Sequence, residues 1–242
     1  QQLGLKLKFL DVELDTLNMD VSRLEEALTP KTRMVVAVSI LGNPCALDIL
    51  RTFCDKYELY LFEDNCESMG ALLNGKLCGT FGDIGTFSTF FSHHISTMEG
   101  GIIVTKDEEI YHLAKSLRAH GWTRDIPPDS SIYNKNSDDF YEAYRFILPG
   151  YNARPLELSG ALGIEQLKKL DSLLAIRKQN AKVFVDLFGQ DERFIIQKEN
   201  GSSSWFSFAI ILNPRYSRDR SQVIKALREN EIEFRMITGG CF

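Results

Sequence analysis

Three short segments of this chain carry side chains that can bind a phosphorylated ligand or move a proton. They are residues 63–71 (EDNCESMGA), 87–101 (FSTFFSHHISTMEGG) and 150–157 (GYNARPLE). Carboxylate and hydroxyl groups form hydrogen bonds with polar ligand atoms, and imidazole exchanges a proton close to neutral pH. The residue types therefore favour acid–base chemistry at a polar site.

Each segment also has an ordinary structural explanation. Asp64, at the end of an apolar run, can cap a helix or form a turn, and Gly100–Gly101 can be a turn before a strand. His93 and His94 can be solvated or bonded within their own loop. Because the chain has four histidines and no His-x-x-x-His spacing, we expect no metal site at this pair. Taken singly, the segments leave both explanations open.

The hydrophobic pattern around these segments predicts an α/β fold that would gather them. The run 34–41 is almost wholly apolar, which is typical of a strand buried on both faces. Further elements are expected in the order helix 20–28 with Asp20 as N-cap, helix 46–57, strand 59–62, strand 84–90, strand 101–105 and helix 107–119. This alternation indicates a mainly parallel sheet flanked by helices, in which ligands bind beyond the carboxyl ends of the strands. Asp64 and residues 88–94 lie at or just after such ends.

The second half of the chain has a different organisation. Residues 123–145 are polar and rich in turn formers, and we expect a long excursion or flap there. The later elements are expected to be helix 155–170, helix 171–188, strand 205–212, helix 217–229 and a strand that starts at Ile232. We therefore expect residues 1–175 to form part of a large domain and residues 176–242 part of a smaller α+β domain, with the chain cut at both ends.

Composition and charge narrow the classes of function. The net charge of -5 argues against a general nucleic-acid or anionic-membrane binder, because such surfaces are usually basic. No apolar run approaches the roughly 18 to 20 residues that span a bilayer. Five cysteines without a C-x-x-C pair indicate reduced thiols, a cytoplasmic setting and no zinc site.

The order and spacing of the three segments resemble the sugar aminotransferase and dehydratase family of the aspartate-aminotransferase fold (fold type I). Members carry E-D-x-x-[QE]-x-x-G-A, then S-F-x-x-x-K with a Glu-Gly-Gly turn, then Y-N-x-R. Residues 92–101 and 117–125 (LRAHGWTRD) further resemble the 3-dehydratases of 3,6-dideoxysugar synthesis, of the colitose and O-antigen type. The resemblance implies pyridoxal or pyridoxamine 5'-phosphate as cofactor, glutamate as amino donor and a nucleotide-linked 4-keto-6-deoxyhexose, GDP-4-keto-6-deoxymannose, as substrate.

The resemblance also implies roles for four cofactor-binding residues. Asp64 would keep the pyridine nitrogen of the cofactor protonated, because a buried carboxylate favours the charged ring. Glu67 would face the 3-hydroxyl of the ring, and Ser88 would bind the phosphate. Asn152 would reach a phosphate from the neighbouring subunit, which implies a homodimer.

His93 is where the chain departs from the aminotransferases, because it stands where they have lysine. An imidazole cannot form the Schiff base that tethers pyridoxal phosphate, so a freely bound pyridoxamine form is expected. Histidine can instead act as the general base and acid. His94 is the alternative catalytic residue, and His120 and Arg124 are expected to contact the nucleotide sugar, since arginine suits a diphosphate.

Two other functions remain open. A sugar-nucleotide aminotransferase would share every motif except the lysine, but no lysine lies between Lys76 and Lys106. A non-catalytic relative that only binds a sugar nucleotide or a protein partner would have little need of Asp64, Glu67, Ser88 and Asn152.

Overall fold

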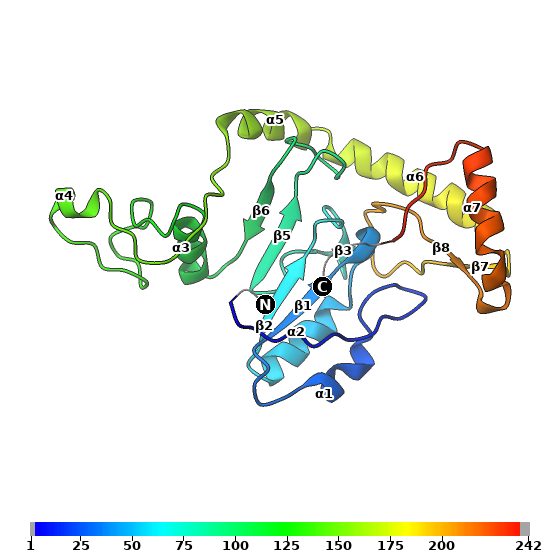
Figure 1. Ribbon diagram of the computed structural model, residues 1–242, viewed down its shortest axis with the longest axis horizontal. Helices are drawn as coiled ribbons and strands as arrows, with labels where there is room; N and C mark the ends of the chain where they lie inside the picture. Colours follow the sequence, from blue (N-terminus) through cyan, green and yellow to red (C-terminus); the bar gives the residue numbers. More distant parts are fainter. Residues whose placement is uncertain (1–2, 238–242) are drawn as a thin grey trace.

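The computed structural model describes residues 3–237, and a four-stranded sheet lies at its centre (Figure 1). The strands are β1 (Met34–Val38), β2 (Tyr60–Asp64), β5 (Ile84–Ser88) and β6 (Gly101–Val104), in the order β1-β2-β5-β6. Strand β2 pairs in parallel with both β1 and β5, whereas β6 runs antiparallel to β5. The predicted mainly parallel sheet is therefore confirmed.

Helix α2 (Leu47–Lys56) covers one face of β1 and β2 and forms the main core with them. Leu47, Leu50 and Cys54 of this helix are fully buried, and they belong to the same apolar cluster as Ala37 and Leu61 of the strands. These three residues lie on one face of the helix, because they recur at a spacing of three to four residues, and this face packs on the strands.

The expectation that the run 34–41 is one strand buried on both faces is wrong for the described residues. Strand β1 ends at Val38, and residues Ile40–Gly42 form a short 3-10 turn. Val35 and Ala37 are buried beneath α2, but Met34, Val36 and Val38 on the other face are 40%, 40% and 44% exposed. A continuous apolar run shows that both faces are suited to burial, but it does not specify what covers each face.

Local signals set several element ends as predicted. Asp20 caps a short 3-10 turn (Val21–Arg23) that leads into α1 (Leu24–Ala27). Asp107 caps α3 (Glu108–Leu117), where its carboxylate accepts a hydrogen bond from the Ile110 N–H at 3.0 Å. A carboxylate at this position satisfies a backbone donor that the first helical turn leaves free. A small hairpin, β3 (Leu72–Leu73) and β4 (Lys76–Leu77), joins β2 to β5.

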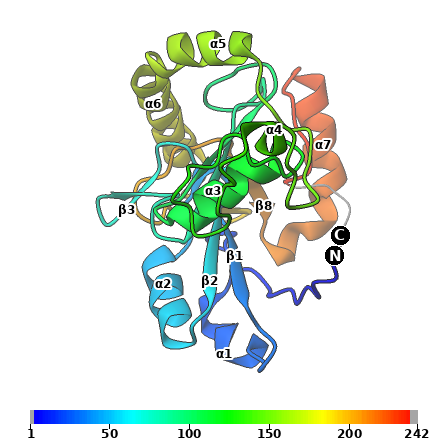
Figure 2. The same ribbon diagram turned by 90° about the vertical axis from the view of Figure 1, so that its left-hand side faces the viewer.

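The remaining elements lie to either side of the sheet and beyond the carboxyl end of β5 (Figures 1 and 2). They are α4 (Asp139–Glu142), α5 (Glu157–Leu167), α6 (Leu170–Phe188), β7 (Phe194–Ile196), β8 (Ile210–Leu212), a 3-10 helix (Pro214–Asp219) and α7 (Arg220–Glu229). The predicted excursion at 123–145 holds only the one-turn helix α4. Helix α5 crosses beyond the carboxyl end of β5, and α6 leads from there to the α7 side of the molecule.

Three details of the second half differ from expectation. The expected strand 205–212 shortens to β8, which pairs with the unpredicted strand β7. The backbone of residues 203–206 instead forms hydrogen bonds with Leu41 and Gly42, in the turn after β1, and not with a neighbouring strand. Residues 232–237 form no strand. The division at residue 175 stays a prediction, and that residue lies inside the continuous helix α6.

Within residues 3–237, every helix is too short or too polar to cross a membrane. Cys45, Cys54, Cys66 and Cys78 are free thiols, and Cys241 lies outside the described residues. The same part of the chain holds no cluster of three or more side chains suited to a metal ion.

Candidate active site

Parallel pairing brings Asp64 and Ser88 to the same edge of the sheet. Asp64 is the last residue of β2 and lies opposite Thr86, two residues before Ser88 at the end of β5. The Asp64 carboxylate accepts a hydrogen bond from the Cys66 N–H at 3.0 Å, and the Ser88 hydroxyl accepts one from the Phe90 N–H at 3.2 Å. Each side chain therefore bonds to the backbone at the start of the loop that follows its strand. Both loops begin at the edge of the sheet where a ligand is predicted to bind.

Glu67 is half-buried in the loop after β2 and is held by a backbone donor. Its carboxylate accepts a hydrogen bond from the Leu41 N–H at 2.7 Å. Burial raises the pKa of Glu67, and the negative charge of Asp64 acts in the same direction, whereas the Leu41 N–H and the charge of Arg235 oppose this rise. A carboxyl group in this state can share a proton with a ligand hydroxyl.

His93 lies in the loop after β5, and its ring is in contact with two aromatic side chains. The ring centroids of Phe206 and Phe90 lie 5.0 Å and 6.0 Å from that of His93. Burial lowers the pKa of His93, the charge of Arg235 lowers it further, and Asp64 and the Phe90 carbonyl oppose this. Among residues 3–237, its buried Nδ1 atom has no hydrogen-bond partner. The lowered pKa makes the ring a neutral base at neutral pH.

His94 has a different environment from its neighbour. It is only 2% exposed, and its Nε2 atom lies 3.3 Å from the Ser204 carbonyl oxygen. Burial, followed by the charge of Arg177, lowers the pKa of His94 to about 4. A buried, neutral ring that is bonded to the backbone favours a structural role for His94 over the alternative catalytic one.

The charge of Asp64 acts on both Glu67 and His93, but no hydrogen bond, ion pair or ring contact of Asn152, His120 or Arg124 reaches these residues within the described chain. The exposed Asn152 accepts a hydrogen bond from Arg154, and the His120 N–H donates to the Tyr151 carbonyl. Arg124 lies over the Trp122 ring at 3.8 Å. Within the described chain, none of the contacts of these three residues reaches His93, so their assigned roles remain predictions.

Sequence reasoning missed Phe206, Arg177 and Arg235. Phe206 touches the His93 ring, Arg177 lies beside His94, and the charge of Arg235 acts on both Glu67 and His93. All three lie more than 80 residues after His93 in the sequence. No local motif marks them, because their nearness to the site depends on how the last third of the chain folds back.

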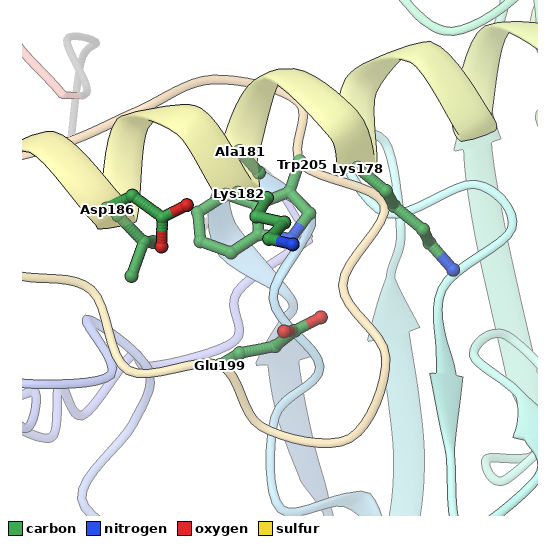
Figure 3. A pocket seen from close by; sticks show the side chains of 7 residues that line it. Lys178, Ala181, Lys182, Asp186, Glu199 and Trp205 are labelled. Carbon is green, nitrogen blue, oxygen red and sulfur yellow. The ribbon is translucent and has the colours of Figure 1, made fainter.

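A separate open pocket of about 290 Å³ lies between α6 and the segment that leads to Trp205 (Figure 3). Two lysines, Lys178 and Lys182, and two acidic residues, Asp186 and Glu199, line it, so the charges balance. None of the predicted site residues lines this pocket. It therefore gives no reason to move the candidate site away from the strand ends.

Comparison with known proteins identifies the family of this chain. Residues 1–239 match the profile of the DegT/DnrJ/EryC1/StrS aminotransferase family. The chain belongs to this family. The family resemblance and the aminotransferase-type fold are thus confirmed. Over its whole length the chain is 50% identical to GDP-4-keto-6-deoxy-D-mannose 3-dehydratase of Yersinia pseudotuberculosis and covers 62% of that protein.

Two solved structures of GDP-4-keto-6-deoxymannose-3-dehydratase are similar to this family member. A histidine-to-asparagine mutant with bound GDP-perosamine has a TM-score of 0.93 and 48% identity, over 98% of this chain and 62% of the other. A form with a trapped PLP-glutamate geminal diamine has the same score and identity, over 98% and 61%. The chain therefore spans about three fifths of the length of these relatives.

Proposed function

We propose that the full-length protein is a vitamin B6-dependent 3-dehydratase that acts on GDP-4-keto-6-deoxymannose in 3,6-dideoxysugar synthesis. The observation that carries this proposal is a histidine in place of the aminotransferase lysine. His93 lies in the loop after β5, and no lysine lies between positions 76 and 106. The relatives with bound GDP-perosamine and PLP-glutamate support the substrate, the cofactor and glutamate as amino donor. The proposal places the enzyme in the cytoplasm.

The donor set of the site fits pyridoxal or pyridoxamine phosphate. Asp64 would hold the pyridinium nitrogen, the Glu67 carboxyl would meet the 3-hydroxyl, and the Ser88 hydroxyl would bind the phosphate. The raised pKa of Glu67 suits a hydrogen bond to a phenolic oxygen, because the two groups can share one proton. When bound, the cofactor supplies an amine that condenses with the sugar ketone and a ring that accepts electron density.

His93 would carry out the proton transfers of the dehydration. Its lowered pKa keeps the imidazole neutral at neutral pH, so it can accept the proton from the C4′ carbon of the cofactor. The imidazolium that results can then give a proton to the departing C3 hydroxyl of the sugar. The rings of Phe90 and Phe206 pack against this ring.

The fate of the amino group tests this function. Glutamate with a labelled nitrogen, pyridoxamine phosphate and GDP-4-keto-6-deoxymannose would be incubated with the full-length protein. We expect the label in ammonia and none in the sugar, because hydrolysis after loss of the C3 hydroxyl frees the nitrogen and gives a 3-deoxy-4-keto sugar. A stable 4-amino sugar as the main product would establish the aminotransferase instead, and unchanged substrate would favour the non-catalytic relative.

A complementation experiment tests the proposed homodimer. We expect Asn152→Ala and His93→Asn each to lose most of the activity when expressed alone, whereas the two chains co-expressed should regain about a quarter of the wild-type sites. Half of the dimers would be mixed, and each of these would have one intact site with Asn152 from one subunit and His93 from the other. Light scattering should show a dimer, and a fully active monomer would contradict the proposal.

A further inference from the structure

Residues 203–206, which we call the brace, are bonded on one side to the turn after β1. The N–H groups of Ser204 and Phe206 donate to the carbonyls of Gly42 and Leu41, both at 2.9 Å. The Ser203 hydroxyl donates to the Gly42 carbonyl at 2.8 Å. Gly42 has a φ of +88°, and a Cβ atom there would lie 2.7 Å from the Trp205 nitrogen. The turn and the brace are thus in direct backbone contact.

Two basic side chains hold the other side of the brace. The Arg177 guanidinium, from α6, donates to the carbonyls of Trp205 and Phe206 at 3.1 and 2.9 Å. His94 lies 3.3 Å from the Ser204 carbonyl, and its pKa of about 4 means that the ring is neutral at pH 7. In the neutral ring, Nε2 can carry the single N–H and donate a hydrogen bond to that carbonyl. Three successive carbonyls of the brace are engaged in this way.

Phe206, the last residue of the brace, lies against His93, the proposed catalytic base. The Phe206 ring lies 5.0 Å from His93 and 5.7 Å from His94. Glu67 is tied to the same structure, because the Leu41 N–H donates to its carboxylate and the Ser204 hydroxyl donates to its carbonyl at 3.4 Å. One short segment therefore contacts both sides of the candidate site.

The His93 ring depends on packing for its orientation, because no hydrogen bond at Nδ1 fixes it within the described residues. In catalytic histidines, a hydrogen bond at one nitrogen commonly fixes the ring and directs the other nitrogen. Among the described residues, the buried Nδ1 of His93 has no such partner. Its orientation must then come from packing, and Phe206 makes the nearest ring contact.

We propose that Phe206, held in the brace by His94 and Arg177, is a positioning residue that orients the His93 ring and shields it from water. This inference rests on the proposed function for the identity of His93 as the base. It assigns His94 to the support of its neighbour and explains why two adjacent histidines have such different surroundings.

Phe206→Leu tests the proposal in the full-length protein. We expect kcat for dehydration to fall about tenfold or more, with little change in the KM for the GDP-sugar, because a misdirected base slows the reaction without weakening substrate binding. NMR titration should show the pKa of His93 rising toward its ordinary value as the ring gains water. Asp64 and Arg235, the charged groups that act on His93, are unchanged in this variant.

Matched variants separate positioning from stability. Phe188→Leu removes a similarly half-buried ring that packs on Phe184 and Phe194, and it should leave kcat and the pKa of His93 unchanged. Phe206→Tyr keeps the ring and should retain most of the activity. If Phe206→Leu fails to fold, His94→Leu should raise the pKa of His93 and lower kcat in the same way, whereas His94→Gln, which keeps a donor, should do so less.

An unchanged pKa of His93 and an unchanged kcat in the folded Phe206→Leu protein would overturn the proposal. The NMR measurement does not depend on turnover. A wild-type protein that does not dehydrate the GDP-sugar would therefore count against the proposed function, while the comparison of pKa values would still decide whether Phe206 shields and positions His93.

Discussion

Replacing His93 by asparagine is expected to lower the rate of dehydration by about a hundredfold or more, since asparagine can fill the space but cannot accept a proton. Binding of pyridoxamine phosphate should persist, because Asp64, Glu67 and Ser88 are untouched. Product formation from GDP-4-keto-6-deoxymannose measures the rate, and the absorbance of the bound cofactor measures its retention. His112→Asn changes a buried histidine whose Nδ1 atom is hydrogen-bonded to Ser130, away from the site, so it should keep the wild-type rate.

The pH profile of the wild-type enzyme gives an independent check on His93. Because burial lowers its pKa below the ordinary 6.5, the neutral base form should persist at lower pH than for a solvated histidine. The acidic limb of kcat should therefore fall below pH 6.5, and it should disappear from the residual activity of His93→Asn. An acidic limb that survived this substitution unchanged would assign the titration to another group.

Lysine at position 93 tests the alignment of this residue with the aminotransferase lysine. We expect borohydride reduction of His93→Lys to attach the cofactor at position 93, as peptide mass mapping would show. Attachment at another residue, or none, would contradict the spacing from Ser88 on which the assignment depends.

Asp64→Asn is expected to lower the rate of dehydration by about a hundredfold or more. A neutral amide cannot stabilise the protonated pyridine nitrogen, and without that charge the ring accepts electron density poorly. The loop should keep its shape, because the asparagine carbonyl can still accept the hydrogen bond from the Cys66 N–H. Turnover and the affinity for pyridoxamine phosphate, measured by absorbance titration, would report the effect.

Asp107→Asn is the matched control for this substitution. Asp107 also accepts a backbone N–H bond at the start of a segment, but it caps α3 away from the cofactor site, and asparagine is an equally good cap. Turnover and thermal stability should stay at the wild-type level. If Asp64→Asn retained more than about half of the wild-type turnover, the proposed role of Asp64 toward the ring nitrogen would be rejected.

Local patterns were sufficient for the sheet and for the edge at which the site forms. The apolar run before Asp64 and the one before Ser88 predict strands, and in the mainly parallel sheet that the strand–helix order predicts, both side chains emerge at one edge. The caps of Asp20 and Asp107 were equally readable, because a cap depends on residues only two or three positions away.

Family resemblance supplied what the local pattern could not, namely the importance of His93. The histidine itself is ambiguous, and only its distance from Ser88 relates it to the aminotransferase lysine. The role of Asn152 remains a prediction, because it requires a second chain, and one chain shows only the exposed side chain and its bond to Arg154.

The tertiary structure alone decided how His93 and His94 differ. Adjacent in sequence, they diverge because the brace, more than 100 residues later, places the Ser204 carbonyl against His94 and the Phe206 ring against His93. The same holds for β1, whose apolar face opposite α2 stays partly exposed in the described chain. Hydrophobic periodicity reports which side chains can leave water, but the partner that each one meets is determined by long-range packing, which no local spacing encodes.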